Sequence, residues 1–351
     1  MVENNAHVEN PRCTLAMLRS VVLAALIASV VWWLQGASHS LSSRVVVVAD
    51  LHGDFEHALN VLRMAGVVAQ DSLKWSGGKT VLVSTGDLVD RGDDTIALYR
   101  LFGALREESK ATGGRVVQLF GNHEIMNLVG DWRYVTPGDI ASFGGSKKRE
   151  AAMRTGWLGN EWHKNYQAVA RVPLLEGALP RGYEPPAIGL AHGGMSPPFA
   201  ALGIDAINRY SHPFVSKFVA SLEPWDSVYD NTTAEERAIE GAHGPLWYRG
   251  FALDDDEIAC ANANASANAL GVRHLVMGHT PSLSGFFVRC DGQVLIIDTG
   301  ISRAYGGKQS ALVFDTSLTG SAKGWYEKSV ATALYVASEP EVIGEWERAG
   351  P

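Results

Sequence analysis

The chain has 351 residues, of which 46% are hydrophobic and 19% are charged. This length and composition are typical of a folded chain with one large α/β domain or two small ones. The formal net charge is −8. Proteins that bind nucleic acid through its phosphates usually carry a basic excess, so the balance of charge argues against nucleic acid as the main partner.

An apolar segment, residues 21–34, stands near the start of the chain and follows two arginines. Its length suits the hydrophobic region of a signal peptide and is short for a membrane span of roughly 20 residues. Trp32 and Trp33 would suit a membrane interface and favour an uncleaved anchor. A cleaved signal and an anchor both remain open, and a buried core helix is the weaker alternative. Either of the first two places the remaining chain outside the cytosol, on a membrane or in a secretory or organelle lumen.

Cysteine is scarce, with only Cys13, Cys260 and Cys290 in the chain. A cleaved signal peptide would remove Cys13 and leave an even pair. In an oxidising compartment Cys260 and Cys290 could form a disulfide, and two unrelated thiols are the equally open alternative.

Strand and helix patterns alternate after the apolar segment. Residues 37–43 are rich in serine and are expected to be a linker that ends an N-terminal tail, residues 1–43. Buried strands are then expected at 44–49, 80–85 and 115–120, with helices at 55–65 and 95–108 between them. This alternation predicts βαβ units and a largely parallel sheet.

The second half of the chain is less regular. Helical insertions are expected near 131–170 and 199–248, and the basic run 147–149 is interpreted as a solvated face. Further strands are expected at 188–191 and 273–277, and short antiparallel strands at 285–290, 294–298 and 311–315 would close a second sheet. The alanine- and asparagine-rich stretch 259–269 is expected to be a surface loop or a frayed helix. The main domain then covers 44–335, and 336–351 form a C-terminal tail.

Residues that bind metals or transfer protons follow five of the predicted strands. The segments are A-D-L-H-G-D (49–54), G-D-L-V-D-R-G (86–92), G-N-H-E (121–124), A-H-G-G (191–194) and M-G-H-T (277–280). In open α/β sheets, ligands bind at the carboxyl ends of the strands. The five segments are therefore expected to meet in one crevice.

Six residues of these segments form a set of candidate metal ligands: Asp50, His52, Asp87, Asn122, His192 and His279. Mixed oxygen and nitrogen ligands suit manganese, iron or zinc and are poor for calcium. Two divalent or trivalent ions about 3.5–4 Å apart can hold a phosphate and activate water for in-line attack. Such a pair needs a bridging carboxylate, and Asp87 is the candidate. The neighbouring glycines would let the backbone approach the site closely.

In this order the segments resemble the motifs of the calcineurin-like metallophosphoesterase superfamily, in its phosphoprotein phosphatase branch. The stretches 121–136 (GNHEIMNLVGDWRYVT), 191–194 (AHGG) and 244–252 (GPLWYRGFA) are most similar to Shewanella-like protein phosphatases. The resemblance covers about residues 45–315. It implies an α/β fold in which two mixed sheets flanked by helices form a β-sandwich, with a dinuclear metal site at the carboxyl ends of the strands.

The resemblance also implies roles for individual residues. One metal would be held by Asp50, His52 and Asp87, and the other by Asp87, Asn122, His192 and His279. His123 matches the general acid that protonates the leaving oxygen, and Asp90 matches the aspartate that orients it. Arg91 and Arg249 match the arginines that bind phosphate oxygens, with Asn122 beside them. Residues 298–303 (DTGISR) depart from the eukaryotic pattern, so no counterpart of its tyrosine next to the phosphate is expected.

The leading hypothesis is a metal-dependent phosphatase that acts on phosphorylated proteins, and the resemblance favours phosphotyrosine. A phosphoesterase for nucleotides or other small molecules, similar to diadenosine polyphosphatases, is the alternative within the hydrolases. A membrane protein with a vestigial metal site is the alternative outside them, and the complete set of ligands disfavours it. The sequence carries no signal for the oligomeric state.

Overall fold

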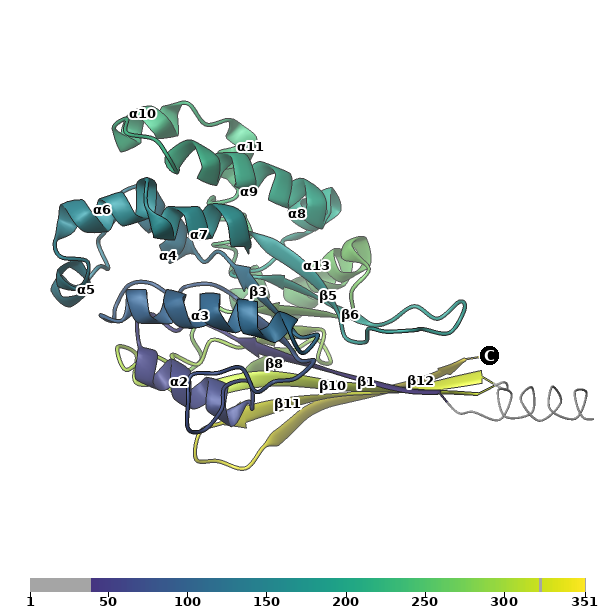
Figure 1. The fold of residues 1–351 in the computed structure, drawn as a ribbon. Helices are drawn as coiled ribbons and strands as arrows, with labels where there is room; N and C mark the ends of the chain where they lie inside the picture. The colour runs from purple at the N-terminus through teal and green to yellow at the C-terminus, as the bar shows by residue number, and fades with distance from the viewer. Residues whose placement is uncertain (1–38, 322–323, 351) are drawn as a thin grey trace, which may run out of the picture.

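The computed structural model describes residues 39–321 and 324–350 (Figure 1). The apolar segment 21–34 and the predicted signal or anchor lie outside these residues. Within the described ranges, no helix has both the length and the apolar character needed to cross a membrane.

The described strands form two mixed sheets. The first has the order β12-β11-β10-β1-β2-β3-β4, in which β1 to β4 are parallel and β10 to β12 are antiparallel. Its bounds are β1 His39–Val48, β2 Val81–Ser84, β3 Arg115–Leu119, β4 Tyr166–Gln167, β10 Ser310–Ser321, β11 Gly324–Tyr335 and β12 Glu341–Gly350. The second has the order β5-β6-β7-β9-β8. Its bounds are β5 Val169–Pro173, β6 Ala187–Ala191, β7 His274–Met277, β8 Phe287–Arg289 and β9 Val294–Ile296.

Alternate side chains of β1 pack into two different cores. Val45 and Val47 lie in the cluster between the sheets, with side chains of β6, β7 and β9. Val46 and Val48 lie in the cluster under the helices on the outer face. Because side chains along a strand point to opposite faces, a strand buried on both faces needs a continuous apolar run. This explains the unbroken valines of the sequence and confirms the predicted sandwich.

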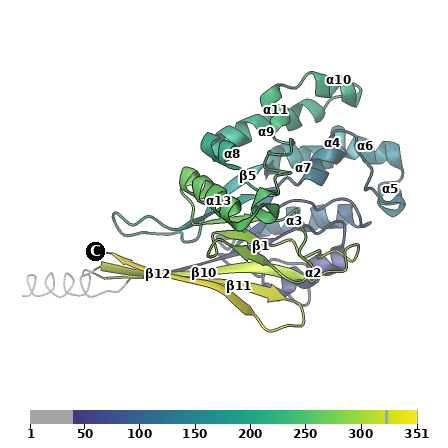
Figure 2. The same cartoon turned by 180° about the vertical axis from the view of Figure 1, so that it is seen from behind.

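Helices cover both outer faces and one end of the sandwich (Figures 1 and 2). The helices α2 and α3 connect the parallel strands of the first sheet, and α13 packs on the second sheet. Their bounds are α2 Phe55–Met64, α3 Thr95–Lys110, α12 Gly250–Leu253 and α13 Asp256–Leu270. The remaining helices stack above the sheets: α4 Asn122–Leu128, α5 Pro137–Ser142, α6 Ser146–Arg154, α7 Trp157–Asn165, α8 Pro197–Leu202, α9 Ile204–Phe218, α10 Trp225–Asp230 and α11 Ala234–Ala238.

The ends of the domain differ from expectation. Residues 39–43, expected as a linker, are the first part of β1 and pair with β10, and 341–350 of the expected tail form β12. The predicted strand at 311–315 is part of β10 and joins the first sheet beside β1, not the second. Residues 39–43 and 341–350 contain few consecutive apolar residues, so the sequence gives them no strand signal, and buried positions of the neighbouring strands can also be polar. Glu327 of β11, for example, is fully buried and accepts hydrogen bonds from Arg273 and Arg348.

Residues 259–269 are also corrected, because they lie inside the regular helix α13 rather than in a loop or frayed helix. Ala259, Ala263 and Ala267 are buried at intervals of four residues and form its packed face. Alanine has the highest helix propensity, and Gly271 ends the helix in the left-handed conformation.

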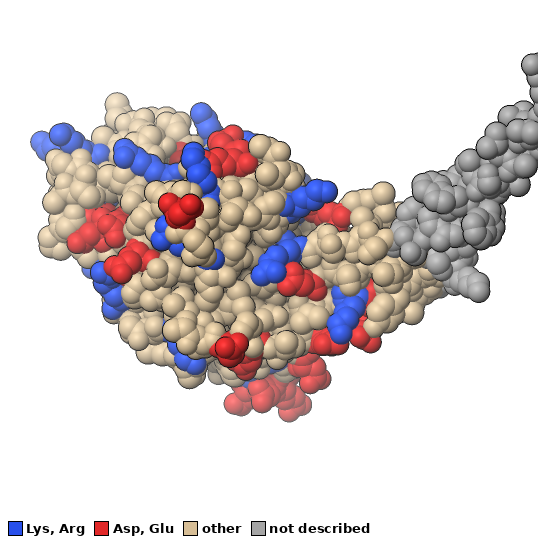
Figure 3. All heavy atoms as spheres, turned by 60° about the horizontal axis from the view of Figure 1, so that its bottom comes forward, with Lys and Arg blue, Asp and Glu red and all other residues tan. Residues whose placement is uncertain are grey.

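The face shown in Figure 3 mixes acidic and basic side chains among uncharged ones.

Cys260 and Cys290 form a disulfide that joins α13 to the turn after β8. Replacing both cysteines by serine should lower the free energy of unfolding by about 2–4 kcal/mol, because the unfolded chain gains freedom. Urea unfolding without reductant measures this difference, and wild type unfolded with reductant serves as the control. Coincident unfolding curves for the double variant and the wild type would contradict the expectation.

Candidate metal centre

The loops after the strands hold several site residues in the left-handed backbone conformation. Non-glycine residues rarely adopt positive φ, and those that do cluster at functional sites. Six such residues occur in the predicted motifs: Asp50 (φ 38°), His52 (42°), Asp87 (55°), Asp90 (69°), Arg91 (65°) and His279 (66°). These tight turns aim successive side chains into one crevice.

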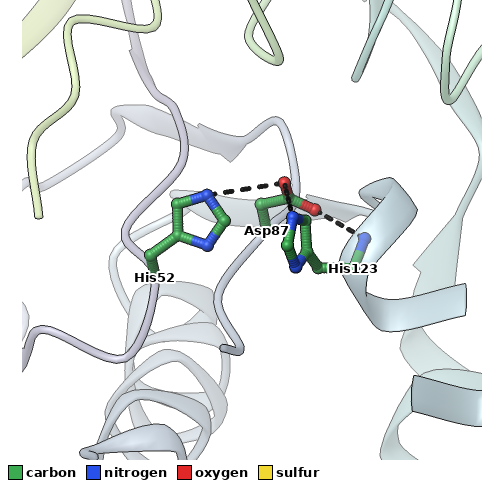
Figure 4. A group of neighbouring side chains, drawn as sticks. All are labelled: His52, Asp87 and His123. Atoms are coloured by element: carbon green, nitrogen blue, oxygen red, sulfur yellow. Dashed lines mark hydrogen bonds and ion pairs between the residues drawn. The ribbon is translucent and has the colours of Figure 1, made fainter. Parts of the chain in front are cut away.

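Asp87 is the centre of the site. Its Oδ2 atom lies 3.2 Å from Nε2 of His192, 3.6 Å from Nε2 of His52 and 3.9 Å from Nε2 of His123. Figure 4 shows the rings of His52 and His123 on either side of this carboxylate. Burial by itself would raise the pKa of Asp87, but the neighbouring His192 and His123 lower it well below its usual range. Asp87 thus has the position expected of a bridging carboxylate.

The hydrogen bonds of the histidines favour ring nitrogens that are free to bind a cation. Nδ1 of His192 donates to the carbonyl oxygen of Thr85 at 3.0 Å, and Nδ1 of His52 donates to that of Val89 at 3.0 Å. In neutral rings, Nε2 then carries a lone pair. Burial lowers the pKa of His52 to about 4, so its ring is neutral at physiological pH.

The donor set fits a metal. Nε2 of His192 faces Oδ1 of Asn122 at 2.9 Å as well as the Asp87 carboxylate. Atoms with lone pairs repel one another at these distances unless a proton or a cation lies between them. Nε2 of His279 is buried and has no hydrogen-bond partner. The centre of its ring lies 4.9 Å from that of the His192 ring, so the two imidazoles are neighbours in the site. Asp50, His52, Asp87, Asn122, His192 and His279 are therefore able to hold cations together.

Glycines make room for the carboxylates. A Cβ atom at Gly121 would lie 2.0 Å from Oδ1 of Asp87, and one at Gly278 would lie 2.1 Å from Oδ1 of Asp50. Asp50 is further fixed by the backbone N–H of His279, which donates to its Oδ2 at 3.0 Å. No other residue type could occupy these two positions without moving a predicted ligand.

Two buried acids support the ligands, and neither was among the predicted site residues. Glu124 accepts hydrogen bonds from the backbone N–H groups of Asp87, Leu88 and Gly121 at 2.7–2.9 Å, so it fixes the loop after β2. Asp298 lies beside Asp50, and burial raises its pKa to about 6. The G-N-H-E motif contained the signal for Glu124. Nothing in the local sequence distinguished Asp298.

His123 and Asp90 form a buried pair beside the ligands. Nδ1 of His123 donates to Oδ2 of Asp90 at 2.6 Å, and Nε2 faces Asp87. Burial disfavours the charged ring, but Asp87 and Asp90 raise the pKa of His123 above its usual value. The second oxygen of Asp90 accepts from Asn127 at 2.8 Å. The structure thus brings the predicted proton donor into a hydrogen bond with the carboxylate predicted to orient it.

Arg91 lies between two tyrosine rings at the edge of the site. Its guanidinium carbon is 4.5 Å from the ring centre of Tyr134 and 4.9 Å from that of Tyr305. Tyr305 is also stacked 5.4 Å from the ring of His52. The sequence offered no clear counterpart of the eukaryotic tyrosine at 298–303, and the structure places Tyr305, two residues further on, beside Arg91.

Arg249 reaches the site from the other side. Its Nη1 donates to the carbonyl oxygen of His279 at 2.8 Å and to Oγ1 of Thr280 at 3.0 Å. Arg91 and Arg249 thus place two positive charges beside a cluster of carboxylates and imidazoles. Together with bound cations, this arrangement can hold a phosphate group and deliver a proton to an oxygen attached to it.

Comparisons with known proteins agree with this geometry. Residues 43–283 match the family model described as calcineurin-like phosphoesterase. An uncharacterized protein of Schizosaccharomyces pombe is 38% identical over 76% of each chain. Shewanella-like protein phosphatase 2 of Arabidopsis thaliana is 26% identical over 74% of this chain and 72% of its own. The crystal structure of a cold-active protein-tyrosine phosphatase from a Shewanella species superposes with a TM-score of 0.64 at 23% identity, over 86% of this chain and 80% of that one.

Asp87→Asn should reduce the metal content of the purified protein, because the substitution keeps the shape of the side chain but removes its charge. Elemental analysis after dialysis should find at most about half of the transition metal that the wild type holds, since a bridging carboxylate would serve both ions of a pair. The exposed change Asp71→Asn is the matched control. An unchanged metal content in Asp87→Asn would contradict the assignment of Asp87 as the bridging ligand.

Proposed function

The chain belongs to the calcineurin-like phosphoesterase family, and on that premise we propose that it removes phosphate from phosphorylated proteins, with phosphotyrosine preferred. One observation carries the proposal: the imidazoles of His52, His123 and His192 converge on one oxygen of Asp87. The match to a Shewanella-like protein phosphatase supports protein substrates.

The residues of the site divide the work of phosphomonoester hydrolysis. Arg91 and Arg249 bind the phosphate oxygens and hold the phosphorus in line for attack. His123 gives its Nε2 proton to the leaving oxygen, and Asp90 holds the ring in the orientation that this transfer needs. Asp87 and the other ligands would hold two ions, for which manganese, iron or zinc suit the mixed donor set. When bound, these ions supply an activated water and neutralise charge on the phosphate.

Aromatic side chains favour an aryl phosphate. Tyr134 and Tyr305 flank Arg91, so a phenyl ring attached to the phosphate can stack on their faces. Tyr134 is 37% exposed and is therefore accessible to an incoming peptide. A nucleotide base could stack in the same way, so the substrate panel that tests the proposal includes nucleotides.

A substrate panel tests the proposal. With manganese added, the purified protein should hydrolyse phosphotyrosine peptides faster than phosphoserine peptides and faster than nucleotides. His123→Asn should retain its metal yet lose about 10²–10⁴-fold in kcat on peptides, because general acid catalysis contributes that much. Activity on nucleotides alone would favour the small-molecule alternative. No activity on any member of the panel would defeat both.

We further propose that the apolar segment 21–34 directs the chain out of the cytosol, either as a cleaved signal or as an anchor. The disulfide between Cys260 and Cys290 supports an oxidising compartment, because cytosolic thiols are normally kept reduced.

Fractionation of cells that express the chain with a C-terminal tag tests this localisation. The tagged protein should be protected from added protease in intact membrane vesicles. Alkaline carbonate washing then separates an anchor, which stays with the membrane, from a cleaved signal, which leaves a soluble product. Recovery of the full-length chain in the cytosolic fraction would overturn the proposal.

A further inference from the structure

Arg149 is buried although it lies in a run of three basic residues. Its neighbours Lys147 and Lys148 on α6 are exposed, as expected of a solvated face, but the Arg149 side chain is 0% exposed. An unpaired buried guanidinium would be very costly, so its surroundings must compensate the charge.

The contacts of Arg149 lead toward the general acid. Nε donates to Oδ2 of Asp139 at 2.7 Å, and Nη1 donates to Oδ1 of Asn127 at 2.7 Å. Its guanidinium carbon lies 4.7 Å from the ring centre of Trp132. Asn127 in turn donates from Nδ2 to Oδ1 of Asp90 at 2.8 Å. An unbroken chain of buried polar groups thus joins α6 to Asp90, and Nη2 of Arg149 itself lies 3.8 Å from Oδ1 of Asp90.

Arg149 helps to set the orientation of the Asn127 amide, whose Nδ2 donates to Asp90 at 2.8 Å and to the backbone carbonyl oxygen of His123 at 2.9 Å. A guanidinium has donors only, so it requires the amide oxygen of Asn127 on its own side. The amide NH₂ must then face Asp90, where it donates to one carboxylate oxygen and leaves the other for His123. The reversed amide would place an oxygen against Oδ1 of Asp90 and disturb the 2.6 Å hydrogen bond to His123.

We propose that Arg149 is a positioning residue for proton donation, acting through Asn127 and Asp90 on His123. Asp139 compensates its charge and lets the guanidinium stay buried. The inference rests on the proposed phosphatase function, because it concerns the proton given to the leaving oxygen. If Arg149 has this role, the helical insertion that carries it contributes to catalysis in addition to covering the site.

The dependence of rate on the leaving group separates this role from a purely structural one. Phenyl phosphate has a poor leaving group that needs a proton, whereas 4-nitrophenyl phosphate has a good one that needs it much less. The double variant Arg149→Met, Asp139→Asn removes both charges of the Arg149–Asp139 pair and leaves Asp90 with His123 and Asn127 as its partners. The ratio of kcat/KM for 4-nitrophenyl phosphate to that for phenyl phosphate should rise by about 10–100-fold, a part of the full contribution of general acid catalysis.

Three comparisons complete the experiment. Asn127→Ala breaks the same chain without touching the ion pair and should raise the ratio similarly, so the test survives if the double variant folds poorly. Lys148→Met, an exposed change on the same helix, should leave the ratio at the wild-type value. In a His123→Asn background the double variant should not raise the ratio further, because the proton donor is already absent.

A wild-type ratio in both the double variant and Asn127→Ala would overturn the inference, as would an equal further rise in the His123→Asn background. Metal content and melting temperature, measured on each preparation, show whether a loss of activity on both substrates has a structural cause. A wild-type protein that hydrolyses neither aryl phosphate would instead refute the proposed function, so the two failures are distinguishable.

Discussion

The concentration of buried lone pairs around Asp87 is the constraint on which the rest of the site depends. Its carboxylate meets three imidazoles, and Asn122 adds an amide oxygen within 2.9 Å of His192. Burial raises the pKa of the nearby Asp50 and lowers that of His52 to about 4, so the positive charge beside the carboxylates comes from Arg91 and Arg249 rather than from the His52 ring. A site of this kind is stable when cations bind it, and that requirement explains why its ligands are held so rigidly.

Rigidity comes from turns that only a packed scaffold can hold. The left-handed conformations at Asp50, His52 and Asp87 cost free energy in isolation, and the surrounding sandwich over-determines them. Glu124 fixes the loop of Asp87 through three backbone hydrogen bonds. The valines of β1, packed on both faces, anchor the strand from which the first ligands emerge. Stability of the core and geometry of the site are therefore linked.

The helical insertions contribute to the site as well as covering it. Tyr134 stacks on Arg91, and Arg149 reaches Asn127 from α6. Arg149 comes from a basic run whose sequence suggests only a solvated face, and Tyr134 comes from the end of the stretch 121–136. The disulfide between Cys260 and Cys290 adds a covalent tie on the opposite side, between α13 and the turn after β8. Distant parts of the chain thus meet around one small group of polar atoms.

The sequence by itself determined the apolar strands, the order of helix and strand, and the polar residues that follow five strand ends. These are local patterns, and the rule that ligands bind at strand carboxyl ends converts them into a site. Only the tertiary structure decided that Arg149 is buried and that Tyr305 lies beside Arg91. It also decided that residues 39–43 pair with β10 and that Cys260 and Cys290 form a disulfide. Each depends on partners far along the chain, because burial and pairing are set by packing rather than by neighbouring residues.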